Sequence, residues 1–184
     1  MSRTASTMLP LGTIAPNFQL KDVISGEQVK LTHSSDNKAT VIMFICNHCP
    51  YVKHINCELT RLANDYMPLG VRFLAINSND VESYPDDSPE NMLLTAKMHH
   101  YPFPYLYDET QDVAKAYHAA CTPDFYVFNA EMSLVYRGQF DDSRPGNTIA
   151  VSGDSIRQAL DCLINNKPLI IEQKPSLGCN IKWK

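Results

Sequence analysis

The sequence predicts an α/β protein with a central mixed β-sheet flanked by helices, an N-terminal β-hairpin and a C-terminal extension. Continuous apolar runs, typical of strands buried on both faces, alternate with segments whose apolar positions recur at helical spacing. Strand, helix and strand follow one another with short connections, which indicates a βαβ unit. At 184 residues the chain fits one domain, expected to span residues 1–184 with a core of about 12–164 and a tail of 165–184.

The first half of the chain predicts the hairpin and then the βαβ unit. Polar and apolar residues alternate on both sides of the Ser25-Gly26 turn signal, as in paired strands with one buried face. The next run is apolar throughout, as in a central strand, and leads to a helical pattern that Pro68 and Gly70 stop. A second buried-strand pattern follows. The predicted elements are hairpin strands at 17–21 and 28–31, a strand at 39–45, a helix beyond Pro50 whose apolar positions run from Val52 to Tyr66, and a strand at 71–76.

The second half predicts shorter elements. The stretch 78–87 is polar and acidic and is interpreted as an exposed loop, and Ser88 with Pro89 supplies an N-cap and a first-turn proline for a helix. Thr110 is a second candidate N-cap, and Asn129-Ala130 separates two strand-like runs. The predicted elements are a helix from Ser88 to about His99, a strand at 105–107, a helix at 110–117, hairpin strands at 125–128 and 134–136, and a helix at 154–164.

Charge and hydropathy argue against several classes of function. The formal net charge is -4 and Lys/Arg residues do not cluster, so we expect neither a nucleic-acid partner nor an anionic membrane surface as partner. The first ten residues carry one Arg and lack the apolar run of a signal peptide, and no segment approaches the ~20 apolar residues that span a bilayer. We therefore expect a cytoplasmic protein. The oligomeric state does not follow from the sequence.

Six cysteines in a reducing compartment indicate a redox-active or metal-binding pair rather than a framework of disulfides. Cys46-Asn47-His48-Cys49 lies directly after a predicted buried strand and at the start of a predicted helix. Unpaired N–H groups and partial positive charge at a helix N-terminus favour a thiolate over a thiol. We predict that Cys46 is the nucleophile, that His48 lowers the pKa of Cys46 further, and that Cys49 is the resolving thiol.

Metal binding is the alternative interpretation of the same pair. Zinc sites of this kind usually combine two pairs of ligands, and the sequence has no second Cys-x-x-Cys or His pair at finger-like spacing. A c-type haem link requires His after the second cysteine, where the chain has Pro50. We expect no cofactor and no resident metal. A metal-binding or structural module remains the alternative outside the enzymes.

Three motifs resemble the peroxiredoxin-like (AhpC/TSA-type) branch of the thioredoxin superfamily. They are Gly12-Thr-Ile-Ala-Pro-Asn-Phe18, Phe44-Ile-Cys-Asn-His-Cys-Pro50 and Cys121-Thr-Pro-Asp-Phe125, and the likeness runs from about Gly12 to Ile164. The resemblance implies a thioredoxin-like fold and a cis peptide at Thr122-Pro123 that faces the active cysteines. Such a turn would present the backbone edge of Thr122 to an extended substrate, as in strand addition.

The peroxidase motif of that family, Pro-x-x-x-Thr-x-x-Cys, does not fit either cysteine. Its Pro and Thr positions are occupied by Ile42 and Cys46 when counted from Cys49, and by Ala39 and Met43 when counted from Cys46. We therefore predict a thiol–disulfide oxidoreductase that acts on a protein or small-molecule disulfide. Its electron donor would be a thiol system such as thioredoxin or glutathione. A thiol peroxidase that reduces hydroperoxides is the alternative.

Two further cysteines are candidate redox thiols. Cys121 precedes the Thr-Pro turn and would lie near the active pair, although a buried free cysteine often serves only as a small core residue. Cys179 lies in the tail, which could bring it to the active pair or to a partner chain. Cys57 and Cys162 fall within predicted helices and are expected to pack there.

Overall fold

The computed structural model describes residues 3–33, 36–169 and 172–184. The strands are β1 (Arg3–Ala5), β2 (Gln19–Asp22), β3 (Gln28–Lys30), β4 (Ala39–Phe44), β5 (Val71–Asn77), β6 (Tyr105–Tyr107), β7 (Cys121–Thr122), β8 (Asp124–Asn129), β9 (Leu134–Gly138) and β10 (Leu177–Asn180). The helices are α1 (Pro50–Tyr66), α2 (Pro89–Met98), α3 (Asp112–Ala116) and α4 (Asp154–Ile164), with 3-10 turns at Met67–Leu69 and Pro85–Asp87.

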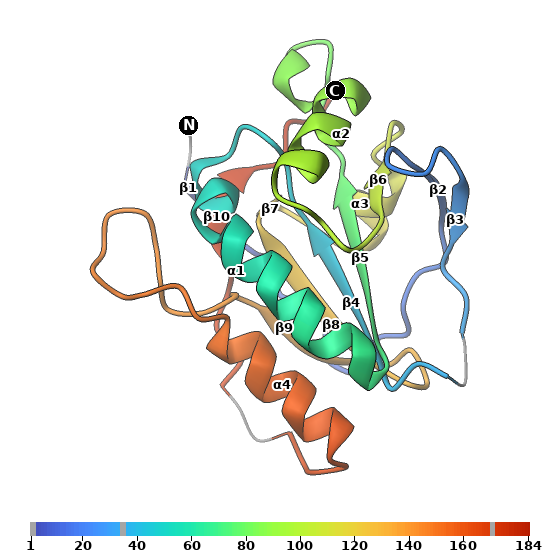
Figure 1. Ribbon diagram of the computed structural model, residues 1–184, viewed down its shortest axis with the longest axis vertical. Coiled ribbons are helices and arrows are strands. Elements are labelled where there is room, and N and C mark those ends of the chain that lie inside the picture. The colour runs from blue at the N-terminus through green and yellow to red at the C-terminus, as the bar shows by residue number, and fades with distance from the viewer. Residues whose placement is uncertain (1–2, 34–35, 170–171) are drawn as a thin grey trace.

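A seven-stranded mixed sheet forms the centre, in the order β3-β2-β6-β5-β4-β8-β9 (Figure 1). β5 lies parallel to both β4 and β6, whereas β8 and β2 join antiparallel to β4 and β6. The parallel neighbours β4 and β5 are connected through α1, as a parallel pair requires a crossover. The structure confirms the predicted mixed sheet, its βαβ unit and the N-terminal hairpin of β2 and β3.

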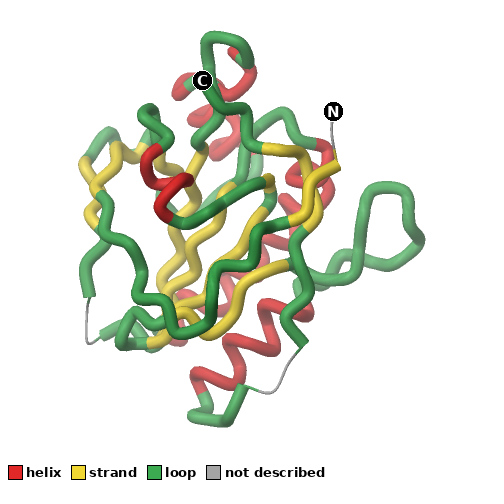
Figure 2. Tube along the Cα trace, turned by 180° about the vertical axis from the view of Figure 1, so that it is seen from behind, coloured by secondary structure: helices red, strands yellow, loops and turns green. Residues whose placement is uncertain are grey.

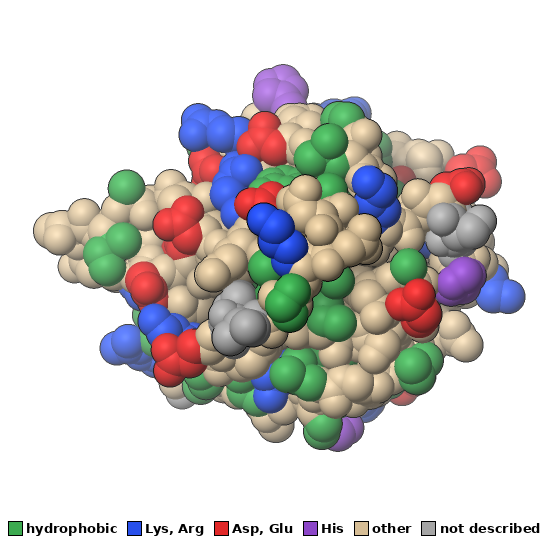
Figure 3. Space-filling model, turned by 90° about the horizontal axis from the view of Figure 1, so that it is seen from below, with side chains coloured by type: hydrophobic (Ala, Val, Ile, Leu, Met, Phe, Trp, Pro, Cys, Tyr) green, Lys and Arg blue, Asp and Glu red, His purple; other side chains and the backbone are tan. Residues whose placement is uncertain are grey.

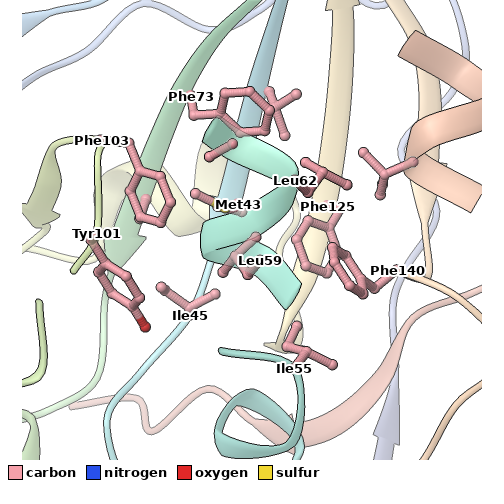
Figure 4. Packing of buried hydrophobic residues seen from close by; sticks show 14 of the residues in the cluster. Met43, Ile45, Ile55, Leu59, Leu62, Phe73, Tyr101, Phe103, Phe125 and Phe140 are labelled. Atoms are coloured by element: carbon pink, nitrogen blue, oxygen red, sulfur yellow. The ribbon is translucent and has the colours of Figure 1, made fainter. Parts of the chain in front are cut away.

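Apolar clusters cover both faces of the sheet. On the face of α1 and α4, Leu59 and Leu62 of α1 point toward Met43 of β4 and Phe125 of β8 (Figure 4). The opposite face is covered by α3 and by loops (Figure 2). Every residue of β4 is buried, which explains why its sequence is apolar where a one-sided strand would alternate. Each large apolar side chain buried in this way contributes about 1.5–3 kcal/mol.

A second, three-stranded sheet joins both ends of the chain to the Thr-Pro turn, in the order β1-β10-β7. Cys179 of β10 pairs with Arg3 of β1 on one side and with Thr122 of β7 on the other. The described part of the tail is therefore ordered and paired. These strands have two to four residues each, too few for an alternating pattern to mark them in the sequence.

The predicted exposed loop after β5 is wrong for several of its residues. Ser78, Asn79 and Asp87 are buried. Their polar groups are satisfied internally, as when Ser78 Oγ donates to Asp108 Oδ2 over 2.7 Å. The predicted N-cap Thr110 is also corrected, because α3 begins at Asp112 and its N-cap residue is Gln111.

The face seen from the α4 side carries acidic and basic side chains next to one another (Figure 3). Arg157 of α4 binds Glu58 and Asp65 of α1 over 2.7 and 2.8 Å, which ties the two helices together at the surface. Among the described residues, no helix is both long enough and apolar enough to cross a bilayer.

Candidate active site

The Cys-x-x-Cys turn connects the end of β4 to the start of α1. Cys49 is the N-cap residue of α1 and Pro50 is its first residue, a position where the missing proline N–H costs no helical hydrogen bond. Cys46 and Cys49 are 1% and 0% exposed. Because β4 and β5 are parallel, the residues that follow β5 come to the same edge of the sheet as this turn.

Thr122 of β7 contacts both cysteines of the turn. The Thr122-Pro123 peptide is cis, as the family resemblance implies. Thr122 Oγ1 lies 3.2 Å from Cys46 Sγ, and the protonated thiol of Cys49 donates to the Thr122 carbonyl over 3.2 Å. The structure therefore brings together four residues of the predicted site, namely Cys46, Cys49, Thr122 and Pro123.

The two thiols differ in acidity. The pKa of Cys49 is lowered to about 5, chiefly by a hydrogen bond from the Cys46 thiol and, against the effect of burial, also by the Cys179 thiol and by the backbone N–H groups of Val52 and Cys179. Burial raises the pKa of Cys46 well above its usual value, and the contact with Cys49 and the charge of Asp87 raise it further. In the reduced pair, the negative charge therefore resides on Cys49.

This distribution differs from the predicted low pKa of Cys46. The helix begins after Cys49, so the backbone N–H of Val52, in its first turn, points to Cys49 and stabilises that thiolate instead. The location of the motif at a helix start is correct. The thiol at the helix end is the second cysteine of the motif.

His48 is joined to a buried carboxylate. Its Nδ1 lies 2.6 Å from Asp87 Oδ2, and its ring stacks on Tyr84 with centroids 5.6 Å apart. The hydrogen bond to Asp87 raises the pKa of His48. His48 Nε2 is buried and has no hydrogen-bond partner among the described residues. His48 is thus paired with Asp87, whose charge raises the pKa of Cys46.

Asp87 is the site residue that the sequence analysis missed. It is fully buried and accepts hydrogen bonds from the Asn47 backbone and from Asn79 Nδ2, each over 2.7 Å. Burial alone would raise the pKa of Asp87, but its hydrogen bonds with His48 and Asn79 lower it. A signal was present, because the polar run containing Asp87 follows a buried parallel strand, and sites form at the carboxyl ends of such strands.

The other four cysteines differ in how far they are buried. Cys179 is 4% exposed, and burial raises its pKa to about 12. Cys121 is fully buried, and its thiol points to the Pro123 carbonyl at 3.8 Å. Burial raises the pKa of Cys121 as well. Cys57 is exposed, so the expectation that it packs within the helix is wrong, and Cys162 is half-buried.

The edge of β7 is already paired, contrary to the expectation that it receives an extended substrate. Cys179 of β10 lies opposite Thr122, and Asn180 lies opposite Cys121. Strand addition at this edge requires free backbone groups. The tail of the chain itself occupies the position that a substrate strand would take.

Surface hollows adjoin the His48 side of the site. A hollow of about 590 Å³ is lined by residues of α1 and α2 together with Asn47 and His48. A second, of about 250 Å³, lies between His48 and the turn from Ser83 to Asp86. His48 lines both hollows, and one ligand atom each of Cys46, His48 and Asp87 lie within 4.8 Å of one another, although Cys46 itself is buried.

Comparisons with known proteins place this chain among redox proteins. A model of the AhpC/TSA family matches residues 11–137. The crystal structure of an uncharacterized conserved protein from Geobacillus kaustophilus is 63% identical, with a TM-score of 0.97 over 100% of this chain and 97% of that chain. The crystal structure of a hypothetical protein from Sinorhizobium meliloti 1021 is 45% identical, with a TM-score of 0.95 over 98% of each chain.

A more distant similarity concerns the fold alone. The thioredoxin domain of a thiol-disulfide oxidoreductase from Bacteroides vulgatus is 15% identical, with a TM-score of 0.64 over 83% of this chain and 99% of that chain. The fold is thioredoxin-like, as the resemblance implied. A search of the curated proteins found no match.

Proposed function

The chain belongs to the AhpC/TSA family, and on this premise we propose that it is a thiol–disulfide oxidoreductase with Cys46 and Cys49 as its dithiol centre. The observation that carries the proposal is the hydrogen bond between the two thiols at the N-terminus of α1, which holds a thiolate beside a second thiol. Such a pair can attack a disulfide and close to one.

Cys46 is the entry thiol and Cys49 holds the negative charge. Cys46 is the thiol next to His48, a residue that lines both hollows, whereas Cys49 lies among Cys46, the Thr122 carbonyl and Cys179. As Cys46 attacks one sulfur of a substrate disulfide, its proton passes to the Cys49 thiolate. An S–S bond forms between Cys46 and the substrate, the substrate disulfide breaks, and the other substrate sulfur leaves as a thiolate.

Cys49 then resolves the mixed disulfide. It gives the proton to the departing thiolate, attacks the Cys46 sulfur and releases the second substrate thiolate. The substrate is reduced to one thiol and one thiolate, which takes up a proton from solvent, and the protein is oxidised to a Cys46–Cys49 disulfide, which a thiol donor such as a thioredoxin or glutathione system would reduce again. The low pKa of Cys49 favours the reduced pair and thereby makes the disulfide more oxidising.

Trapping of the mixed disulfide tests these roles. In Cys49→Ser, a synthetic aromatic disulfide should remain attached to Cys46 after the first thiol is released at mildly alkaline pH. Cys57→Ser is the matched control, because Cys57 is an exposed thiol of the same helix, and it should turn over like the wild type. Labelling of Cys49→Ser only at Cys57, with Cys46 unmodified, would show that the entry thiol is assigned wrongly.

A thiol peroxidase is the second candidate, and one contact favours it. The peroxidase motif supplies a Thr hydroxyl near its cysteine, and here Thr122 Oγ1 lies 3.2 Å from Cys46 Sγ although it comes from β7. Stopped-flow reaction with hydrogen peroxide separates the two functions. A peroxidase would react orders of magnitude faster than a free thiolate, whereas the oxidoreductase would react at the free-thiolate rate.

The metal-binding alternative also has a donor set. One ligand atom each of Cys46, His48 and Asp87 lie within 4.8 Å of one another. His48 Nδ1 and Asp87 are already hydrogen-bonded, and Asp87 also binds Asn47 and Asn79, so a metal would have to displace these contacts. Elemental analysis of reduced protein, with a Cys46→Ser control, tests this candidate. Stoichiometric zinc or copper in the wild type alone would support it.

A further inference from the structure

The last strand of the chain lies where the substrate of a Thr-Pro turn would be expected. β10 pairs antiparallel with β7, with Cys179 opposite Thr122. The carbonyl of Thr122 lies 3.2 Å from Cys49 Sγ. Thr122 is therefore the strand partner of Cys179 and also a direct contact of Cys49. A substrate cysteine in this register would present its sulfur to the active pair.

Many contacts hold β10 in this position. Ser176 Oγ donates to the Pro123 carbonyl, and the backbone N–H of Ile181 donates to the Ala120 carbonyl over 3.0 Å. Gly178 lies so close to Thr122 that an added Cβ would be 1.9 Å from the carbonyl oxygen of Thr122. β10 is therefore docked by its backbone, and a glycine is required at the closest approach.

The Cys179 thiol is in contact with Cys49. Both its S–H and its backbone N–H donate to Cys49 Sγ, which also receives the Cys46 thiol. Cys49 thus stands between two thiols, one from its own turn and one from β10. Cys179 is 4% exposed, so bulk solvent and large reagents do not compete for it.

We propose that β10 is a built-in substrate strand, that is, a segment of the chain itself in the position of a bound substrate strand. We propose further that Cys179 is a third redox thiol, which replaces Cys46 as the disulfide partner of Cys49. The proposal rests on the function proposed above. The Cys179 sulfur attacks Cys49 in the Cys46–Cys49 disulfide, the Cys49–Cys179 bond forms, the Cys46–Cys49 bond breaks, and Cys46 takes up the proton that Cys179 loses as it attacks. No net oxidation occurs, and the free Cys46 can meet a second molecule of substrate or donor.

The substrate class follows from this arrangement. Because β7 is filled from within, an extended polypeptide cannot add to it as a strand. The external disulfide is therefore a small molecule, or a flexible protein segment, that enters at His48, which lines both hollows and has a ligand atom within 4.8 Å of the buried Cys46 thiol. The strand contact that other substrates would make is supplied by β10.

Disulfide mapping in a Cys46→Ser variant tests the transfer. Cys162→Ser is added, because without it trypsin leaves Cys162 and Cys179 in one peptide of residues 158–182. After reduction and one equivalent of diamide, the peptide of residues 39–53 should be linked through Cys49 to the peptide carrying Cys179. The same protein with Cys179→Ser is the control and should lose this link.

Two outcomes would overturn the inference. One is a Cys46→Ser protein in which Cys49 and Cys179 both stay free after oxidation, and the other is a link from Cys49 to Cys121. Should that variant fail to fold, acid quenching and alkylation of oxidised protein that carries only Cys162→Ser give the same information. The Cys49–Cys179 link should be found beside the Cys46–Cys49 link, and its absence would refute the transfer.

A Gly178→Ala variant tests the docking itself. The added Cβ would clash with Thr122, so β10 should be displaced and the Cys49–Cys179 link reduced at least several-fold, while alkylation of Cys49 should become faster. Gly146→Ala is the control for a glycine substitution away from β10: no atom lies within 4 Å of a Cβ there, and although its φ of +93° adds backbone strain, the Cys49–Cys179 link should persist. An unchanged link in Gly178→Ala would contradict the built-in strand. If wild-type protein reduces no disulfide at all, the proposed function fails, whereas an active wild type without the Cys179 link refutes only this inference.

Discussion

At the scale of single residues, position decides the chemistry of chemically identical groups. Cys46, Cys49 and Cys121 are all buried, yet only Cys49 has a lowered pKa, chiefly because the Cys46 thiol donates a hydrogen bond to it, and also because the Cys179 thiol and the N–H groups of Val52 and Cys179 do so. Burial without such donors disfavours the thiolate. The acidity of each thiol thus reports its hydrogen bonds.

A titration of the reduced protein checks this assignment. The ultraviolet absorbance of the thiolate should appear with a midpoint near pH 5 in the wild type, because the pKa of Cys49 is lowered to about 5. The midpoint should rise in Cys46→Ala, which removes the strongest donor to Cys49. Cys162→Ser should leave the midpoint near pH 5 unchanged. A wild-type curve with no thiolate below the ordinary cysteine pKa of about 8.5 would contradict the assignment.

Asp87→Asn tests the carboxylate that supports His48. The pKa of His48 should fall, because its hydrogen bond to Asp87 raises it, and the pKa of Cys46 should fall with it, because the Asp87 charge raises that too. NMR titration of the His48 ring measures the first and the pH dependence of alkylation the second. Asp86→Asn changes the neighbouring carboxylate and should shift both values less. Equal shifts in the two variants would remove the special role of Asp87.

At the scale of elements, α1 serves packing and chemistry at once. Its N-terminus carries Cys49, and its apolar face, including Leu59 and Leu62, packs on the sheet (Figure 4). The helix is therefore held rigidly by its buried side chains, and the N–H groups at its start keep a fixed position relative to the cysteine pair. Loss of packing along α1 should loosen the site at its end.

Leu59→Ala measures this packing. Removal of a fully buried leucine should cost about 2–5 kcal/mol in the free energy of unfolding, from lost burial and from the cavity that remains. Leu69→Ala is the control, because Leu69 is 48% exposed, and its cost should be within about 0.5 kcal/mol. Chemical denaturation of reduced protein gives both values, and similar costs for the two leucines would contradict the described core.

At the scale of the whole molecule, strands from the two ends of the chain, β1 and β10, form one small sheet with β7 from the middle of the chain. β1 pairs with β10, and β10 in turn pairs with β7 at the Thr-Pro turn, so the site includes contacts such as Cys49 with Cys179 between residues more than 100 positions apart (Figure 1). Stability and redox state are thereby linked. Changes in the charge of the buried site should also be felt in the stability of the entire protein.

The pH dependence of stability follows from the buried groups. The lowered pKa values of Cys49 and Asp87 mean that their stabilising contributions are lost as pH falls through the folded-state values, near pH 5 for Cys49. Asp124 behaves oppositely. Burial raises its pKa from 3.8 to about 8, so its contribution is full below pH 3.8 and is lost as pH rises to about 8.

Asp124→Asn should therefore stabilise the protein at neutral and alkaline pH. The amide keeps the shape and a contact with Tyr126 but cannot ionise, and each kcal/mol gained should raise Tm by roughly 2–4 °C. The gain should grow from pH 4 to pH 8 in thermal unfolding of reduced protein. A gain that is independent of pH would show that ionisation of Asp124 is not its cause.

Local patterns were sufficient to predict most elements. The apolar run of β4, the helical period of α1 and the N-cap Ser88 each act over a few neighbouring residues, and all three are found as predicted. The Cys-x-x-Cys turn and the cis peptide at Thr122-Pro123 were also located, from the motif position and from the family resemblance. Short strands such as β1 and β10 were not, because pairing partners rather than periodicity create them.

The sequence by itself determined the central sheet, the helix that follows the cysteines and the place of the Cys-x-x-Cys turn between them, because hydrophobic period and turn chemistry are local properties. Only the tertiary structure decided which thiol carries the charge, that Asp87 supports His48, and that Cys179 fills the edge of β7. Each of these depends on hydrogen bonds between residues distant in the chain. The spacing of residues in the sequence does not encode which distant groups meet. The packing of the sheet places His48 Nδ1 2.6 Å from Asp87 Oδ2 and Cys49 Sγ 3.2 Å from the Thr122 carbonyl oxygen.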